Sequence, residues 1–425
     1  MQSINTKSTK LDNFVFIAVL ILFSMVSLVP FFAMKHIKIM NLPMHYLIVG
    51  GIVGILAILT LYNQRWKLTS FDKWLFLLML SFLLSIITSV NKIYTLQSLA
   101  SFFLRGIGVA FVVHKIVITE ERKNQLVLVL LLVASVVSLI GLAEYFAGGI
   151  NPLFHKLYLE GKASWYPIAL TPRSGMISTI GHPLSLSAYL VLLLPFTFLC
   201  FYNRKSIFRF LPFVILLLTI ILSFSRSSWI AAFLVLVIYF CKEKAMIRNN
   251  RKEILVILMI LSLVFFTFPK LRYTFLGRVD LKRIKSEDGF GAISHRFHSY
   301  RTTFNIFKKH PLFGVGMGNY PKVHIAYRAE GTGEKVETPD NMYLRFICET
   351  GLVGTLTFFC FIFYWLYQFW RNRNDIFIWT IFASLVGFLI NQMFGDFFYW
   401  LPTQFLFWFM LGLGVGIKGS NCEDG

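Results

Sequence analysis

Long apolar stretches recur along the whole chain and constrain its fold more than any other feature. The sequence has 425 residues, of which 56% are hydrophobic and 46 are phenylalanine. A helix needs about 20 apolar residues to cross a hydrocarbon core of about 30 Å. We expect a bundle of about 12 transmembrane helices, and therefore an all-α polytopic membrane protein. The approximate spans are 13–33, 43–62, 74–91, 96–116, 124–147, 183–202, 207–224, 227–241, 253–269, 342–368, 375–394 and 400–417.

The short loops between these spans differ in charge. If the N-terminus is inside, most Lys and Arg of the short loops fall on the inner side, for example Arg65, Lys73, Arg122 and Arg371. The opposite short loops hold fewer, with Lys92 among the exceptions. Because Lys and Arg accumulate in loops that stay in the cytoplasm, the pattern predicts that both termini are cytoplasmic.

This topology prediction divides the chain into three parts. Residues 1–270 are expected to form helices one to nine, and residues 342–425 helices ten to twelve with a short cytoplasmic tail. Residues 271–341 are then a large extracytoplasmic, periplasmic loop. A polar loop of this length is uncommon as a mere connector, so we expect it to carry the chemistry. Its excess of Lys and Arg favours an anionic partner, either lipid headgroups or a lipid diphosphate, and no nucleic acid is expected on this side.

Metal and cofactor motifs do not stand out. The five cysteines and nine histidines form no HExxH motif, no His cluster and no Cys/His pair at ligand spacing. We therefore expect no metal and no cofactor.

Within the large loop, residues 294–309 have the pattern of an amphipathic helix. Its apolar positions are Phe297, Tyr300, Phe304 and Phe307, and basic residues including Arg296 and Arg301 surround them. Such a helix would lie on the bilayer surface or cap the bundle. Glycines follow at 314, 316 and 318, where they serve either a tight bend or a phosphate-binding turn.

Arginines at the outer boundary are candidate anion ligands. Arg226 lies in the sequence Ser225-Arg226-Ser227-Ser228-Trp229, in a very short connection between two spans. A guanidinium can hold a phosphate with paired N–H donors, although it can equally extend to lipid headgroups. Arg296 and Arg301 lie on the loop helix, which can fold over the mouth of the bundle, so that two guanidiniums could meet on one diphosphate.

Three further regions hold polar candidates. Asp340 and Asn341 precede the tenth span, where either could cap the helix and Asp340 could instead be a general base. Tyr343 follows them. In the segment 148–182, Trp165, Tyr166, Arg173 and His182 suit either sugar faces or the membrane interface. The polar residues Arg105, His114, Asn391, Gln392 and Asp396 should face the bundle interior, with an Arg105–Asp396 pair as one arrangement.

Taken together, three blocks resemble the O-antigen ligase and O-antigen polymerase family. They are Ser225-Arg226-Ser-Ser-Trp, then Arg296 with the loop helix and the sequence from Lys309 to Asn319, and finally Asp340-Asn341-x-Tyr-Leu with Glu349-Thr-Gly-Leu-Val-Gly354. The resemblance covers roughly residues 180–400. It implies a C-type glycosyltransferase-like bundle with a metal-independent, outward-facing site. Family ligases typically have His at the position of Asp340, so a ligase and a polymerase are both open.

The resemblance also implies a substrate and residue roles. The donor would be an undecaprenyl-diphosphate-linked glycan at the bacterial inner membrane. The acceptor would be either lipid A core, as in lipopolysaccharide assembly, or another glycan repeat unit. On this basis Arg226 and Arg296 would bind the diphosphate. From loop position and charge as well, we expect Arg301 and Arg173 to assist them and Asp340 to activate the acceptor. Asn341 and Tyr343 would order the loop at the substrate site, and His182 would also bind substrate. The alternatives are a transporter or flippase of a lipid-linked anion, which would need charged groups at mid-membrane depth, and a noncatalytic scaffold.

Overall fold

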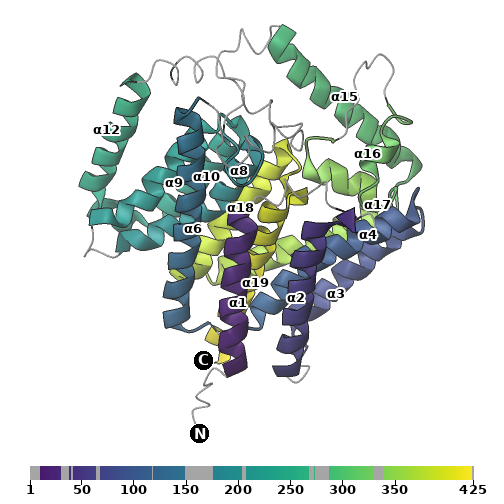
Figure 1. The fold of residues 1–425 in the computed structure, drawn as a ribbon, viewed down its shortest axis with the longest axis horizontal. Coiled ribbons are helices and arrows are strands. Elements are labelled where there is room, and N and C mark those ends of the chain that lie inside the picture. The colour runs from purple at the N-terminus through teal and green to yellow at the C-terminus, as the bar shows by residue number, and fades with distance from the viewer. Residues whose placement is uncertain are drawn as a thin grey trace.

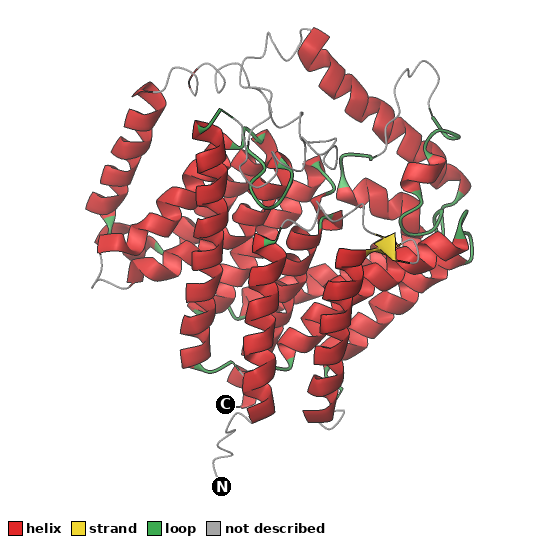
Figure 2. Ribbon diagram, viewed as in Figure 1, coloured by secondary structure: helices red, strands yellow, loops and turns green. Residues whose placement is uncertain are grey.

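Helices make up most of the part of the chain that the structure describes. The computed structural model describes residues 10–29, 38–39, 42–63, 68–116, 118–148, 176–202, 207–267, 272, 287–328 and 338–423. Within these ranges the only strands are β1 (Lys38–Ile39) and β2 (Leu42–Pro43), an antiparallel pair. Figure 2 shows how far the helices, in red, dominate the molecule. Arg173 and the rest of residues 149–175 lie outside the described ranges.

The helices follow the apolar stretches in chain order. In the first half they are α1 (Lys10–Leu28), α2 (Met44–Asn63), α3 (Ser70–Leu83), η2 (Leu84–Ile86), α4 (Lys92–Phe102), the π-helical turn η3 (Phe103–Ile107), α5 (Gly108–His114), α6 (Glu120–Phe146), α8 (Pro183–Leu193) and η5 (Leu194–Tyr202). In the second half they are η6 (Ile207–Phe210), α9 (Leu211–Leu222), α10 (Arg226–Lys242), α11 (Lys244–Asn249), α12 (Arg251–Thr267), α15 (Glu287–Lys309), α16 (Tyr320–Val323), α17 (Met342–Arg371), α18 (Ile376–Asn391), η7 (Gln392–Phe394), η8 (Phe397–Tyr399) and α19 (Leu401–Glu423).

Six helical segments of the described chain are long and apolar enough to cross a membrane. They are Lys10–Leu28, Lys92–His114, Glu120–Phe146, Pro183–Phe201, Met342–Arg371 and Ile376–Phe394. Leu47–Tyr62, Leu211–Leu222 and Leu401–Ile417 are shorter apolar helices. The all-helical architecture and these spans confirm the expected polytopic membrane protein. The full count of about 12 remains a prediction.

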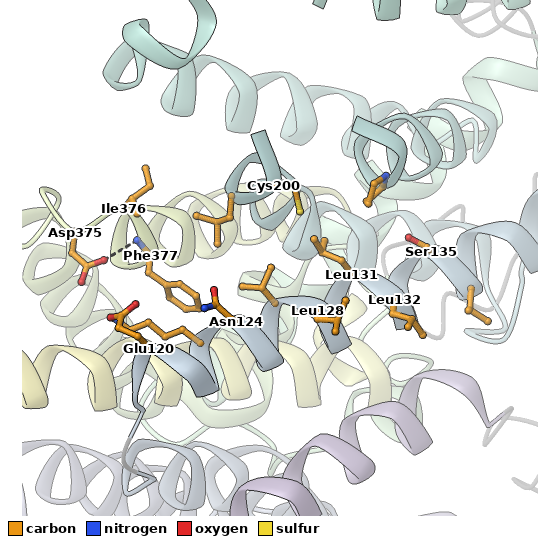
Figure 3. A pocket seen from close by; sticks show the side chains of 15 residues that line it. Glu120, Asn124, Leu128, Leu131, Leu132, Ser135, Cys200, Asp375, Ile376 and Phe377 are labelled. Atoms are coloured by element: carbon orange, nitrogen blue, oxygen red, sulfur yellow. Dashed lines mark hydrogen bonds and ion pairs between the residues drawn. The ribbon is translucent and has the colours of Figure 1, made fainter. Parts of the chain in front are cut away.

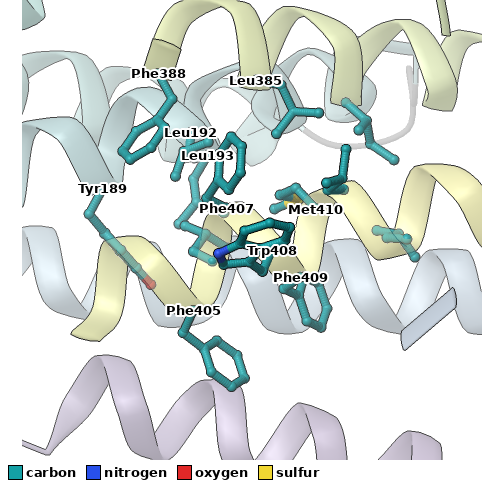
Figure 4. Packing of buried hydrophobic residues seen from close by; sticks show 14 of the residues in the cluster. Tyr189, Leu192, Leu193, Leu385, Phe388, Phe405, Phe407, Trp408, Phe409 and Met410 are labelled. Carbon is teal, nitrogen blue, oxygen red and sulfur yellow. The ribbon is translucent and has the colours of Figure 1, made fainter. Parts of the chain in front are cut away.

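Helix α19 forms the centre of the bundle. Phe405, Phe407, Trp408 and Phe409 point in different directions around it, yet each is at most 1% exposed. A helix that is apolar on all sides is buried on all sides. Figure 4 shows Tyr189, Leu192 and Leu193 of α8 and Leu385 and Phe388 of α18 closing around these side chains. The start of α1 and the end of α19 lie at one end of the bundle, and α15 lies at the opposite end (Figure 1).

Helix α17 is interrupted at Gly351, whose backbone angles are φ 64° and ψ −167°. The interruption frees carbonyl groups on one side and N–H groups on the other. The N–H groups of Val315 and Gly316 donate to the carbonyls of Cys348 (2.9 Å) and Glu349 (3.0 Å). Beyond the break, the N–H groups of Leu352 and Val353 donate to the carbonyls of Pro311 (2.8 Å) and Leu312 (3.2 Å). The glycine-containing segment of the loop is thereby fixed to α17.

Buried ion pairs join helix ends at two places. Asp72 at the start of α3 lies 2.9 Å from His114 Nε2 and 2.7 Å from Lys115 Nζ. Burial opposes the charge of this carboxylate, but hydrogen bonds and charge from His114 and Lys115 hold the pKa of Asp72 well below its usual range. Arg122 at the start of α6 donates to Asp12 of α1 (2.5 Å). These ion pairs fix the start of α3 to the end of α5 and the start of α6 to the start of α1.

Candidate functional site

The three sequence blocks meet at one connection between α18 and α19. We call residues 391–400 the 391–400 connection; it contains η7, Gly395, Asp396 and η8. Asn391 and Gln392 are fully buried, as expected for polar residues in this position. Contacts from α8, α10, α15 and α17 all end on this connection, as described next.

Arg226 is the first residue of α10 and its side chain is exposed. Ser225 caps the helix by accepting a hydrogen bond from the N–H of Ser228. Trp229 closes the turn by donating from Nε1 to the carbonyl of Ile220 at the end of α9 (3.1 Å). Asn391 donates from Nδ2 to Ser228 Oγ (2.9 Å). The first turn of α10, which carries Arg226, is therefore attached directly to the 391–400 connection.

Arg296 lies on α15 and is half-buried. Its Nη2 lies 3.5 Å from the carbonyl oxygen of Phe394, which belongs to η7 of the same connection. This is a long contact for a hydrogen bond. Arg226 and Arg296 are predicted from the sequence to bind one diphosphate. They lie on α10 and α15, and both helices contact residues 391–394. Arg301, one turn later on α15, is exposed and lies over the ring of Phe297 at 5.4 Å.

Asn341, and not Asp340, caps α17. The Asn341 side chain accepts from the N–H groups of Tyr343 (3.0 Å) and Leu344 (3.1 Å), and its Nδ2 donates to the carbonyl of Met393 (2.9 Å). Asp340 has a positive φ of 47° and accepts a hydrogen bond from Thr338 Oγ1 (3.1 Å). Asn341 thus supplies the cap, and Asp340 beside it has a left-handed backbone conformation that costs free energy.

Tyr343 and His182 border the same region. The Tyr343 hydroxyl donates to the carbonyl of Leu389 near the end of α18 (2.6 Å), and its ring stacks on Phe359. His182 caps α8 and its ring lies 5.5 Å from that of Trp400. Ser187, one turn into α8, contacts Ser228 Oγ at 2.7 Å. The described candidates other than Arg301 therefore lie on helix ends that contact this connection or the end of α18.

A buried charge network joins α17 to the 391–400 connection, and its residues were not among the predicted site residues. Arg345 of α17 donates from Nε to Glu349 (3.1 Å) and from Nη1 to Asp396 (2.5 Å). The partner of Asp396 is therefore Arg345, and the predicted Arg105–Asp396 pair is wrong. Arg105 is instead buried in η3 and donates to the carbonyl of Ser101. Tyr399 donates to Glu349 (2.7 Å), and burial together with that carboxylate raises the pKa of Tyr399 well above its ordinary value. The spacing of Arg345 and Glu349, four residues apart in a helix, was the available signal.

The glycine-containing segment serves as a bend. Gly314, Gly316 and Gly318 all have positive φ, between 69° and 91°. A Cβ atom on Gly314 would lie 2.4 Å from the carbonyl oxygen of Cys348, so only glycine fits this approach to α17. The N–H groups of Val315 and Gly316 already donate to α17. The tight-bend interpretation is confirmed, and these two N–H groups are not available to a phosphate.

The structure also contains a cavity of about 920 Å³ away from these candidates. It is mainly apolar and lies between α6, the end of η5 and the starts of α9 and α18. Glu120, Asn124 and Asp375 lie at one end and Leu131, Leu132 and Ser135 farther along (Figure 3). Among the described residues, no three His, Cys, Asp or Glu side chains are grouped to hold a metal ion.

A comparison with family models matches residues 211–359 to the family described as O-antigen ligase. The match begins at α9 and ends within α17, so it includes Arg226, Arg296 and Asp340 together with the interruption of α17. It confirms the resemblance expected from the three sequence blocks. A search of curated proteins gives no significant match.

Proposed function

We propose that this chain, which belongs to the O-antigen ligase family, transfers a glycan from undecaprenyl diphosphate to an acceptor hydroxyl at the outer face of the bacterial inner membrane. The observation that carries the proposal is the meeting of the three blocks at the 391–400 connection. Arg226 comes from α10, Arg296 from α15 and Asp340 from the residues before α17, and each element has a hydrogen bond to residues 391–394. The segments that carry these residues, far apart in sequence, are thus attached to the same connection, which supports the proposal.

Arg226 and Arg296 would bind the diphosphate of the donor. When the bond between the anomeric carbon and the diphosphate oxygen breaks, its electron pair remains on the diphosphate. Two guanidiniums stabilise that developing charge with paired N–H donors. This role needs no metal, and metal independence is part of the proposal.

Asp340 would act on the acceptor. The acceptor hydroxyl oxygen forms the new bond to the anomeric carbon from the face opposite the leaving diphosphate, which inverts the configuration. The hydroxyl proton passes to the Asp340 carboxylate, a job for which a carboxylate within hydrogen-bond reach is suited. The preceding Pro339 and the cap at Asn341 fix the backbone on either side of this carboxylate.

The proposed arrangement in the membrane has about 12 spans, both termini in the cytoplasm and residues 271–341 in the periplasm. In Figure 1, α15 lies at one end of the bundle, and the start of α1 and the end of α19 lie at the other. This arrangement supports a periplasmic position for α15. Arg226 and Arg296 would then act at the outer boundary of the bilayer. The acceptor would be lipid A core or another glycan repeat unit, since Asp340 in place of the family's usual His is compatible with both.

The test is a transfer assay with the purified protein, lipid-linked repeat units and each acceptor. We expect a ladder of products if the protein is a polymerase and a single adduct if it is a ligase. Arg226→Ala and Arg296→Ala should each slow transfer by about 100-fold or more, because each removes a transition-state contact. Arg248→Ala, an exposed arginine on α11, is the matched control and should retain the wild-type rate.

Normal transfer by both arginine variants would refute the proposal. A transporter of the lipid-linked anion would give no product with either acceptor but would move the labelled lipid across reconstituted vesicles. The assay and the vesicle measurement together separate the two functions.

A further inference from the structure

The exposed face of α15 carries aromatic and basic side chains in one stripe. Phe297, Arg301, Phe304 and Lys308 follow one another at intervals of four, three and four residues, which places them on the same side of a helix. Phe297 is 58% exposed and Phe304 54% exposed. We call these four residues the α15 stripe.

The face that α15 buries is polar by comparison. Ser299, Thr302 and Thr303 are at most 2% exposed, and among the described side chains of α15 only Ile306 on this side is a large apolar residue. Thr303 donates to the carbonyl of Ser299, and Cys348 of α17 approaches the Thr303 carbonyl. The small hydroxyl side chains allow α15 to lie close to α17. Of the apolar residues predicted for this helix, Phe297 and Phe304 are exposed and lie on the side of α15 opposite the buried residues.

Each exposed ring is paired with a cation. The Arg301 guanidinium lies 5.4 Å from the centroid of the Phe297 ring, and Lys308 Nζ lies 4.5 Å from that of Phe304. Rings and cations alternating along one helix face are typical of helices that lie in the headgroup layer of a bilayer. There the rings reach the acyl boundary and the cations contact phosphates.

The charge of this region is complementary to an anionic surface. Residues 296–328 contain Arg296, Arg301, Lys308, Lys309, Lys322 and Arg328, but no Asp or Glu. Every full charge in this stretch is therefore positive. Because like charges accumulate here without neighbouring acids in the sequence, an anionic partner lowers their repulsion.

The next element of the chain lies beside the end of a candidate membrane span. Lys322 of α16 lies 3.6 Å from the centroid of the Tyr94 ring, in the first turn of the span Lys92–His114. Ile93 in that turn is 72% exposed, as expected for a side chain that faces lipid. The contact places α16 beside the start of this candidate span, and Asn305 of α15 donates from Nδ2 to the carbonyl of Tyr327, just after α16 (3.2 Å).

We propose that the α15 stripe docks on the headgroups of anionic phospholipids in the leaflet next to it. The occupant is the bilayer surface, because exposed phenyl rings beside cations gain from the acyl boundary as well as from phosphate. Such docking would hold α15, and with it Arg296, over the bundle. This inference does not depend on glycan transfer, since the stripe would bind an anionic bilayer whatever reaction the protein performs.

Hydrogen exchange of the full-length protein in nanodiscs tests this inference. One set of nanodiscs contains phosphatidylcholine alone and the other also contains phosphatidylglycerol. We expect amides of residues 296–309 to exchange about threefold or more slowly in the anionic nanodiscs, because docking suppresses local opening of α15. Amides of α19, in the centre of the bundle, should exchange equally in both and report intact folding.

The double variant Arg301→Gln/Lys308→Gln should lose the lipid-dependent protection of α15. The matched control Lys244→Gln/Arg248→Gln removes the same charge from two exposed positions on α11 and should retain it. Equal exchange of wild-type α15 in the two lipids would overturn the proposal. Equal protection by millimolar inorganic phosphate in phosphatidylcholine nanodiscs would also overturn it, because a discrete phosphate site would then replace the lipid surface.

Discussion

At the residue scale, two neighbouring side chains before α17 have separate tasks. Asn341 accepts from two N–H groups of the first turn and donates to the carbonyl of Met393. Asp340 keeps a positive φ of 47°, for which a non-glycine residue is rarely used. Strained residues of this kind concentrate at functional sites. The sequence could not separate the two residues, because both Asp and Asn are good helix caps.

Replacing Asp340 tests whether its carboxylate takes the acceptor proton. Asp340→Asn keeps the size and the tolerance of positive φ but lacks basicity, so we expect transfer to slow by about 100-fold or more. Asp340→Gly relieves the backbone strain, so its melting temperature should equal or exceed that of the wild type while transfer is lost. Single-turnover rates and melting curves measure both effects.

Asp340→His is the companion variant, since it introduces the residue typical of family ligases. An imidazole can also accept a proton, so part of the transfer activity should remain. A wild-type rate for Asp340→Asn would show that the residue only shapes the loop.

At the element scale, the interruption of α17 fixes the loop to the bundle. Glu349 occupies the last turn before the break, where its carbonyl accepts from Gly316 while its carboxylate accepts from Arg345 and Tyr399. One element thus connects the glycine bend, the buried charge network and the 391–400 connection. The position of α17 followed from its apolar stretch, but the break did not, because glycine is common in transmembrane helices.

Gly351→Ala tests this link. A Cβ atom at Gly351 would lie 2.3 Å from the carbonyl oxygen of Leu312, in a backbone conformation that disfavours alanine. We expect a loss of about 2–4 kcal/mol of stability, seen as a lower melting temperature, together with reduced transfer.

The control for Gly351→Ala is Gly54→Ala in α2, where an added Cβ atom meets nothing within 4 Å. Alanine should stabilise that helix by up to about 1 kcal/mol. Equal melting temperatures for Gly351→Ala and the wild type would mean that the break is not required.

At the scale of the whole molecule, the sequence predicted the helical elements better than the site that they build. Spans such as 342–368 and 375–394 agree closely with α17 (Met342–Arg371) and with Ile376–Phe394, because hydrophobic length determines them. The three blocks were recognisable as separate motifs. Their meeting at the 391–400 connection depends on tertiary contacts such as Ser228 with Asn391, which are 163 residues apart and have no local signal.

Labelling of introduced cysteines tests the proposed orientation. In a background without the five native cysteines, Lys308→Cys on α15 should react with a membrane-impermeant maleimide in spheroplasts. Lys244→Cys on α11 should react only after the membrane is opened, because α11 follows a span that returns to the cytoplasm. Both positions are exposed, so accessibility reports the side of the membrane. The reverse pattern would place the loop in the cytoplasm and remove the proposed site from the periplasm.

The most direct test of the central claim is a double-mutant cycle on binding of undecaprenyl diphosphate. Affinities are measured for the wild type, Arg226→Ala, Arg296→Ala and the double variant. If both guanidiniums hold one diphosphate, the losses will not add, and a coupling of about 1 kcal/mol or more is expected. Strictly additive losses, or no loss in either single variant, would mean that the two arginines do not share a ligand.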